Sequence, residues 1–231
     1  MPLKKSTGNM YPWVTHTHSH LAGECPHKCS YCYVGRNRFG RPARYTGPVR
    51  LVEEEFLVKY GAGKTIFVDH CGDLWAKDIS VEFAPRVLEH CRQWPDNVYV
   101  FQTKNPARYA QLYQWLPARS ILGCTVESNR EYRPIMGSAP TPMERISYMG
   151  GWLRESIHPR FLTIEPILDF DLPSLLGMVV HARPNFVNIG ADSKGCGLPE
   201  PSAEKVRALI EGIQDSGIEI REKHNLARLM K

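Results

Sequence analysis

The chain has 231 residues, of which 42 % are hydrophobic, and its formal net charge is +5. It contains no run of about 18 apolar residues, and no apolar stretch follows its first two lysines, so we expect a cytoplasmic protein with no membrane-spanning helix, signal peptide or membrane partner. The small positive charge permits a polyanionic partner without indicating one, and the seven cysteines favour metal or redox chemistry over a disulfide framework.

Strand-like and helix-like patterns alternate along most of the chain. A first strand is predicted over Trp13–His18. The later strand candidates are Thr65–Val68, Val98–Gln102, Ile121–Val126, Phe161–Ile164, Phe186–Ile189 and Ile218–Ile220. Amphipathic stretches predict helices over Val81–Gln93, Ala107–Trp115, Pro142–Ser156, Leu172–His181 and Ser202–Ser216. This alternation predicts βαβ units and a parallel sheet.

Polar residues and glycines collect directly after these strands. The segments are D-H-C-G-D-L-W (69–75), T-K-N-P (103–106), E-S-N (127–129), E-P (165–166) and G-A-D-S-K-G (190–195). The carboxyl ends of parallel strands carry the sites of both barrels and open sheets. Six or seven strands are too few for an eight-stranded barrel, so we expect an α/β fold of the partial, open TIM-barrel type with its site at this rim.

Residues 34–50 form a different kind of segment, with five arginines, two prolines and three glycines around Phe39 and Tyr45. It is interpreted as a long basic loop. It is either a solvated connection or a surface for phosphate or acidic groups of a substrate.

Three cysteines lie within eight residues, in C-P-H-K-C-S-Y-C from Cys25 through Cys29 to Cys32. One interpretation is a zinc site, in which a nearby histidine supplies the fourth ligand; the candidates are His16, His18, His20 and His27. The histidines of H-T-H-S-H alternate, so on a strand they share one face. A four-iron cluster fits the cysteines better, because three thiolates leave one iron open to a cofactor or substrate.

The spacing C-x3-C-x2-C with an aromatic residue before the last cysteine resembles the signature of the radical S-adenosylmethionine (SAM) superfamily, here Cys25, Cys29, Tyr31 and Cys32. In that superfamily the cluster loop follows the first strand of a partial (β/α)6 barrel. Here the loop follows the candidate strand that ends near His18. The resemblance implies a single radical SAM domain over residues 1–231, with residues 1–12 as an N-terminal extension.

Five later motifs resemble successive strand ends of the phage Gp37/Gp68-like (DUF5131) family. They are G-D-L-W-A (72–76), Q-T-K-N-P (102–106), L-G-C-T-V-E-S (122–128), R-F-L-T-I-E-P-I-L (160–168) and V-N-I-G-A-D-S (187–193). The histidine-rich stretch T-H-T-H-S-H-L-A-G-E-C departs from that family's pattern, which leaves the subfamily and the substrate open.

The superfamily resemblance implies a [4Fe-4S] cluster, SAM, and a reductant such as flavodoxin or ferredoxin. The cluster would reduce SAM to give a 5′-deoxyadenosyl radical, which abstracts a hydrogen atom from the substrate. Gly72 and Asp73, in place of the more usual Gly-Glu, would accept hydrogen bonds from the methionyl ammonium, and Tyr31 would pack on adenine.

Three further residues receive expected SAM contacts. Glu127 would bind the ribose, Lys104 or a backbone amide would bind the SAM carboxylate, and Glu165 would contact SAM or shape the pocket. Structural alternatives stay open for three of the acids: Asp73 as a helix cap, Glu127 as a solvated loop acid and Glu165 as a turn residue.

The remaining cysteines have simpler interpretations. Cys91 and Cys124 fall inside a helix and a strand and are expected to pack in the core. Cys71 and Cys196 fall at the rim, where a thiol could return a hydrogen atom to a product radical. Cys196 is the candidate catalytic residue, with a small buried residue as the alternative.

The sequence therefore predicts a radical SAM enzyme that modifies a nucleobase, nucleotide or DNA. A peptide or small metabolite is the alternative substrate. An alternative of another class is a non-enzymatic module that binds zinc through the cysteines and histidines.

Overall fold

The computed structural model describes residues 3–36 and 40–231. Its main sheet has eight strands in the order β1-β2-β5-β6-β7-β8-β9-β10. Their bounds are Lys4–Lys5, His16–His18, Thr65–Val68, Val98–Thr103, Ser120–Thr125, Arg160–Ile164, Phe186–Ile189 and Glu219–Glu222. All neighbouring pairs from β2 to β10 are parallel, and β1 pairs antiparallel with β2. With β1 and β10 at its two edges, the sheet is the open, partial TIM-type arrangement that the sequence predicts.

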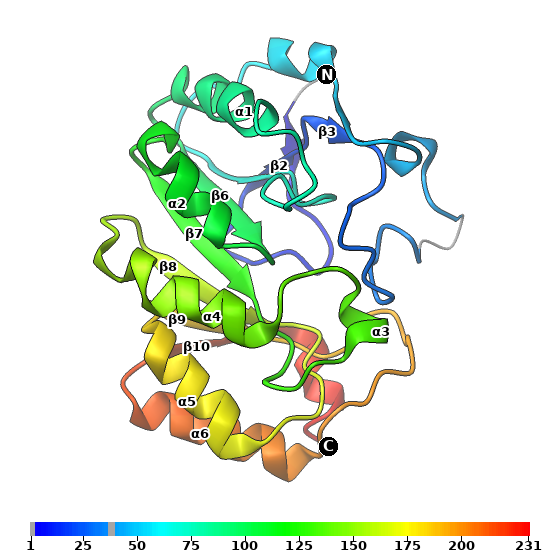
Figure 1. Ribbon diagram of the computed structural model, residues 1–231, viewed down its shortest axis with the longest axis vertical. Coiled ribbons are helices and arrows are strands. Elements are labelled where there is room, and N and C mark those ends of the chain that lie inside the picture. Colours follow the sequence, from blue (N-terminus) through cyan, green and yellow to red (C-terminus); the bar gives the residue numbers. More distant parts are fainter. Residues whose placement is uncertain (1–2, 37–39) are drawn as a thin grey trace.

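Helices cover the outer face of this sheet. The α-helices α1 to α6 span Phe83–Arg92, Ala107–Leu112, Arg133–Met136, Pro142–Gly150, Leu172–Ala182 and Ala203–Asp215. Short 3₁₀ helices cover Ala43–Tyr45, Glu53–Leu57, Tyr113–Trp115, Trp152–Glu155 and His224–Arg228. Figure 1 shows α4, α5 and α6 side by side over the C-terminal strands, with α1 and α2 over the earlier ones. A small antiparallel pair, β3 (Leu21–Ala22) and β4 (Arg50–Leu51), brackets the segment that holds the cysteines.

Helix α4 illustrates how local chemistry sets the element boundaries. Thr141 and Glu144 form a capping box that starts the helix before Pro142. The sequence predicts a helix to Ser156, but α4 ends at Gly150 and continues as a 3₁₀ turn. A Cβ at Gly150 would lie 2.5 Å from the backbone oxygen of His181, so this glycine lets α4 approach α5 closely.

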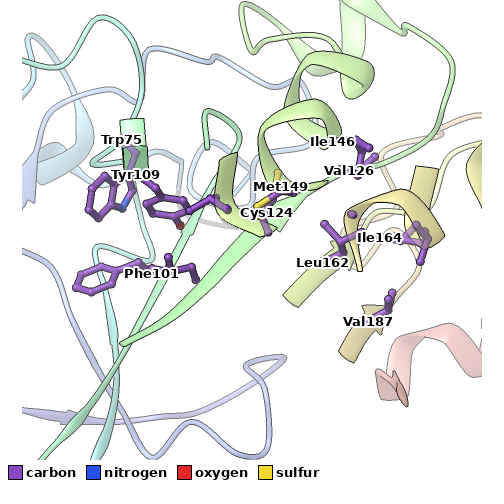
Figure 2. Packing of buried hydrophobic residues seen from close by; sticks show 14 of the residues in the cluster. Trp75, Phe101, Tyr109, Cys124, Val126, Ile146, Met149, Leu162, Ile164 and Val187 are labelled. Carbon is purple, nitrogen blue, oxygen red and sulfur yellow. The ribbon is translucent and has the colours of Figure 1, made fainter. Parts of the chain in front are cut away.

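The two faces of the strands bury different side chains, as the alternation of a pleated strand requires. The outer face packs beneath the helices in one large apolar core. Figure 2 shows Trp75, Phe101 and Tyr109 at one end of this core and Leu162 and Val187 at the other. The inner face holds a smaller cluster that consists of Tyr11, Val14, Phe67, Val100, Phe161 and Phe186.

This inner cluster closes the bottom of the partial barrel. Trp13 stacks on Tyr11 with ring centroids 5.3 Å apart and meets Phe161 edge-on at 5.7 Å. The predicted strand start at Trp13 is therefore wrong, because Trp13 packs into the barrel and β2 begins only at His16. Towards the carboxyl ends of the strands the inner positions become polar, and this change places a cavity at the rim.

Within the described residues, no helix is long and apolar enough to cross a lipid bilayer.

Candidate functional site

A cavity of about 1220 Å³ opens at the carboxyl ends of the strands. Its floor includes the inward-facing Gln102, Thr125 and Thr163 of β6, β7 and β8. Its wall is the loop from Cys25 to Cys32. Ligand pockets usually measure about 300–1,000 Å³, so this cavity has room for a cofactor and a second molecule.

The three cysteines of the predicted cluster loop all line this cavity. Cys25, Cys29 and Cys32 are free thiols and are partly buried. Burial, reinforced by Asp73, raises the pKa of Cys25 to about 12, and burial also raises the pKa of Cys29. Such thiols ionise when a metal binds them. The loop thus presents three metal-ligating groups to one cavity.

The spacing of these thiols bears on which metal they fit. Among the described residues, the one set of three His, Cys, Asp or Glu ligand atoms within 4.8 Å of one another is His18, His20 and His90. A single tetrahedral zinc ion would place its thiolate sulfurs about 3.8 Å apart. The three cysteine sulfurs are therefore not gathered as closely as the ligands of one bound zinc ion.

A segment around α3 holds the cysteine loop from the far side. The backbone N–H of Ser30 donates to Ile135 O at 2.9 Å, and that of Ser138 donates to His27 O at 2.9 Å. Gly137 has φ +64°, and a Cβ there would lie 1.9 Å from His27 O. Sequence reasoning missed this support, because nothing in R-P-I-M-G-S indicates a partner about 110 residues earlier.

Asp73 connects the cysteine loop to the ends of β5 and β6. Its Oδ2 accepts hydrogen bonds from His27 Nε2 at 2.8 Å, Thr103 Oγ1 at 2.9 Å and the Lys104 backbone N–H at 2.9 Å. Its Oδ1 accepts from the Trp75 N–H at 3.0 Å within a local turn. Asp73 is not a helix cap, because the next helix, α1, begins at Phe83 with Glu82 at its N-cap. Burial opposes the charge of Asp73, but these donors hold its pKa below the ordinary value. Gly72 lines the cavity beside it.

Glu127 lies beneath the cavity in a network of charges, so it is not a solvated loop acid. Its side chain is fully buried; Oε2 accepts from Arg145 Nη1 at 2.7 Å, and Oε1 accepts from Lys104 Nζ at 2.8 Å and from the Tyr31 hydroxyl. Burial alone would raise the pKa of Glu127, but Arg145 and Lys104 lower it well below its usual range. Lys104 and Tyr31 line the cavity, whereas Glu127 lies behind them.

Glu165 follows β8 and lines the opposite side of the cavity. Its Oε2 accepts from Lys223 Nζ at 2.7 Å, and its Oε1 accepts from Asn9 Nδ2 at 2.9 Å and Asn225 Nδ2 at 3.0 Å. The carboxylate thus gathers the N-terminal segment and the segment after β10. No sequence motif marks Asn9, Lys223 or Asn225, so these contacts with Glu165 could not be predicted from the sequence.

The two rim cysteines differ in position. Cys71 lines the cavity, and the Tyr33 hydroxyl lies 3.5 Å from its sulfur. Burial raises the pKa of Cys71, but hydrogen bonds from His70 and Tyr33 bring the net value below normal. Cys196 lies in the loop after β9, where its backbone N–H donates to Asp192, and it does not line the cavity.

Several arginines of the basic loop form hydrogen bonds or ion pairs within the protein. Arg44 Nη1 contacts Glu55 at 2.5 Å, and Arg41 Nη1 contacts Glu24 at 3.1 Å. Arg36 donates to Ser30 O at 2.7 Å. Arg36 and Arg41 also line the cavity, whereas Arg44 does not. Residues 37–39 of the loop, which include Arg38 and Phe39, lie outside the described residues.

The early histidines are separate from the cysteines. His16 contacts Thr15, while His18 and His20 lie near His90, and none of these four histidines lines the cavity. Of the four histidines considered as zinc ligands, His27 is the one that lines the cavity with the cysteines, and it is bound to Asp73. A joint site of the cysteines with His16, His18 or His20 is therefore not assembled in this structure.

No protein-family model matches this sequence, and no curated protein matches it. The chain is similar in structure to a variant of spore photoproduct lyase, with a TM-score of 0.68 at 9 % identity over 94 % of this chain and 79 % of that one. A spore photoproduct lyase structure with bound AdoMet and dinucleoside spore photoproduct gives a TM-score of 0.59 at 9 % identity, over 92 % of this chain and 65 % of that one. Streptococcus suis SuiB bound to the precursor peptide SuiA also gives 0.59 at 9 % identity, over 92 % and 49 %.

At such low identity these likenesses show the fold. The chain has the α/β, largely parallel, partial TIM-barrel fold of radical SAM enzymes. The fold prediction is confirmed, and the narrower resemblance to the phage Gp37/Gp68-like family stays a prediction.

Proposed function

We propose that this protein is a radical SAM enzyme in which Cys25, Cys29 and Cys32 hold a [4Fe-4S] cluster and SAM occupies the adjoining cavity. The observation that carries this proposal is the presence of three free thiols from one loop on a large cavity at the strand rim of this fold. Three thiolates leave one iron for SAM. The cluster, reduced by a protein such as flavodoxin or ferredoxin, supplies the electron that cleaves SAM to methionine and the 5′-deoxyadenosyl radical.

The chain's own residues would bind and orient SAM. The backbone carbonyl of Gly72 offers an acceptor to the methionyl ammonium, and Lys104 offers a cation to the carboxylate. Both carboxylate oxygens of Asp73 already accept hydrogen bonds within the protein, so we assign Asp73 to fixing the turn that presents Gly72. Tyr31 offers its ring to adenine. Because the oxygens of Glu127 are already bound, we assign it to the positioning of Lys104 and Tyr31, in place of the predicted ribose contact.

Two further cavity features concern the substrate. Glu165 shapes the side of the cavity opposite the cysteine loop. Cys71 and Cys196 are the candidate thiols for returning a hydrogen atom to a product radical, and Cys71 is the one that lines the cavity.

We propose a nucleobase, nucleotide or DNA as the substrate, because cations outnumber acids around the cavity. The cations are Lys28, Arg36, Arg41, Lys104, Lys194, Lys223 and Arg228, and the acids are Glu24, Asp73, Glu165 and Asp192. Phosphate groups bind such a surface. A spore photoproduct lyase structure holds a dinucleoside, which supports this substrate class, whereas SuiB binds a precursor peptide, the alternative class.

Anaerobic reconstitution tests the proposal. We expect roughly four irons and four sulfides per chain, and 5′-deoxyadenosine after addition of SAM and a strong reductant. Cys32→Ala should lose the iron, and Cys196→Ala should retain it as the matched control. A colourless protein with zinc on the cysteines would support the non-enzymatic alternative. Iron and sulfide without any 5′-deoxyadenosine would contradict the proposed activity.

A further inference from the structure

Three histidines from distant parts of the chain meet in a buried cluster away from the thiol-lined cavity. His18 belongs to β2, His20 follows it, and His90 belongs to α1. Their relative exposures are 7 %, 0 % and 3 %. His20 Nε2 lies 2.8 Å from His90 Nδ1, and Tyr60 Oη lies 2.7 Å from His18 Nδ1 and 3.1 Å from His20 Nε2.

The outward-facing nitrogens of two of these rings have partners that accept hydrogen bonds. His90 Nε2 lies 3.0 Å from Val58 O, so it must donate to that carbonyl. His18 Nε2 lies 2.9 Å from Glu55 Oε2, and the pKa of Glu55 is below normal because its hydrogen bonds from Arg44 and His18 outweigh burial. That carboxylate also accepts. Both rings are buried, where an uncompensated charge is costly, so each holds its one proton on the outward Nε2.

These tautomers turn two nitrogen lone pairs inward, at His18 Nδ1 and His90 Nδ1. The Tyr60 hydroxyl can donate its one hydrogen to His18 Nδ1. His20 must then satisfy both His90 Nδ1 on the inside and Asp69 on the outside, where His20 Nδ1 lies 3.6 Å from Asp69 Oδ2.

A neutral His20 cannot satisfy both sides. With its proton on Nε2, the buried His20 Nδ1 and Asp69 Oδ2 face each other unpaired, and both atoms lack a hydrogen-bond partner in the structure. With its proton on Nδ1, two nitrogen lone pairs face each other 2.8 Å apart at His20 and His90. A cation bound by the inward nitrogens removes this conflict. The lone pair of His20 Nε2 then binds the cation, and His20 Nδ1 carries the proton and can donate it to Asp69 Oδ2.

We propose that His18 Nδ1, His20 Nε2 and His90 Nδ1 bind one divalent transition-metal ion of the zinc class, with the Tyr60 oxygen as the nearest fourth donor. One ring nitrogen of each histidine lies within 4.8 Å of those of the other two, and His20 Nε2 and His90 Nδ1 are 2.8 Å apart. Tetrahedral zinc would place its ligand nitrogens about 3.3 Å apart, so His20 and His90 would have to move slightly apart to admit the ion. Each ring also has a carboxylate or carbonyl behind it, the outer support that metal-bound histidines use.

The ion has an access route and a structural role. A shallow cavity of about 340 Å³ reaches His90 beside Phe56 and Gln93. The bound ion would join α1 to the end of β2. After β2 the chain passes through His20 and Leu21, whose backbone N–H groups donate to Asp69, and then reaches the cysteine loop. The ion would stabilise this segment between β2 and the cysteine loop without taking part in chemistry at the thiols.

The test uses the full chain with Cys25, Cys29 and Cys32 replaced by alanine, so that no cluster thiol competes. Titration with Co²⁺ should give one equivalent with visible d–d bands and no sulfur charge-transfer band. Adding His90→Gln should weaken binding by at least about 100-fold, and Asp69→Asn by about 10–100-fold. His158→Gln, which removes a buried imidazole elsewhere, should leave the affinity unchanged.

Two results would overturn the proposal. The first is a folded triple-alanine chain that binds no Zn²⁺ or Co²⁺. The second is equal binding by His90→Gln and His158→Gln. If His90→Gln fails to fold, X-ray absorption on the triple-alanine chain decides the matter: imidazole ligation supports the site, and ligation without imidazole overturns it.

Discussion

His27 Nε2 donates to Asp73 Oδ2 at 2.8 Å, and this contact joins the middle of the cysteine loop to the Gly72–Asp73 turn after β5. The two residues are 46 positions apart and both are buried. Since the pKa of Asp73 is below normal, its carboxylate is the acceptor. The proposed cluster site and the proposed SAM site are thus held in register by one side-chain pair.

His27→Ala should therefore impair cluster retention more than folding. We expect about 10–100-fold lower 5′-deoxyadenosine formation, the size of effect seen when an outer partner of a metal site is removed. Iron content after desalting and the rate of SAM cleavage measure it. His181→Ala, an exposed residue of α5 that lies beside Gly150 and outside the cavity lining, is the control. Equal iron content and rates in the two variants would disprove the coupling.

Gly137→Ala should destabilise the support beneath the cysteine loop. Its φ of +64° strains any other residue, and an added Cβ would meet His27 O at 1.9 Å. We expect a loss of about 1–3 kcal/mol in the free energy of unfolding, together with weaker iron retention. Gly177→Ala is the matched control, because it lies in α5 with nothing within 4 Å of its added Cβ. That variant should be neutral or up to about 1 kcal/mol more stable. If the two variants have the same stability and iron retention, the contact of Gly137 with the cysteine loop is not needed for either property.

Glu127→Gln should leave Lys104 and Arg145 as buried, poorly compensated cations. Removing one partner of a buried ion pair costs about 3–5 kcal/mol, measured by denaturant unfolding at pH 7. The folded pKa of Glu127 is depressed, so its stabilisation is present above the unfolded pKa of about 4.3 and is lost as pH falls. The difference from the wild type should therefore shrink below pH 4. Glu131→Gln, which breaks an exposed pair with Arg133, should change stability by less than about 1 kcal/mol.

Arg36 and Arg41 should contribute to polyanion binding, because both line the cavity. Replacing both with alanine should weaken binding of a DNA oligonucleotide and reduce the salt dependence of its affinity by about one unit of slope for each phosphate that the protein no longer neutralises. Arg50→Ala, in β4 at the end of the same segment and outside the cavity lining, is the control. Arg44→Ala is unsuitable as a binding probe, because Arg44 is bound to Glu55 and Ser19 inside the protein. Unchanged affinity in the double variant would favour the peptide alternative.

The fold could be predicted because buried parallel strands are short apolar runs and polar residues mark their ends. Phe161–Ile164 is an example: the apolar run is the strand, and Glu165 begins the rim. The order of such runs gives the topology, since parallel connections leave few alternatives. The cysteine loop could be found for another reason, because its chemistry lies within eight residues.

The contacts across the site could not be predicted, because their partners are remote in sequence. Arg145 reads as a surface charge on an amphipathic helix, yet it is fully buried against Glu127, where α4 crosses the end of β7. His90 likewise reads as one polar residue of α1. Its meeting with His18 and His20 depends on how α1 packs against β2, which only the assembled fold defines.

The same histidines should make the stability of the metal-free protein depend on pH. The folded pKa of His18 and of His90 is about 4, below the unfolded value of about 6.5, because burial disfavours their charge. Below pH 6.5 the unfolded chain therefore takes up protons that the folded chain does not, so stability is complete above pH 6.5 and falls as pH drops towards 4.

A shift of 2.5 pH units corresponds to about 3 kcal/mol for one uncoupled histidine, so we expect a total loss of a few kcal/mol. Urea unfolding at pH 7.5, 6 and 5 with a chelator present measures it. His90→Gln should flatten the dependence, while His181→Gln, at an exposed residue of α5 beside Gly150, should preserve it. A wild-type stability that stays constant between pH 7 and pH 5 would show that the folded and unfolded chains take up protons alike, which contradicts the lowered pKa of these imidazoles.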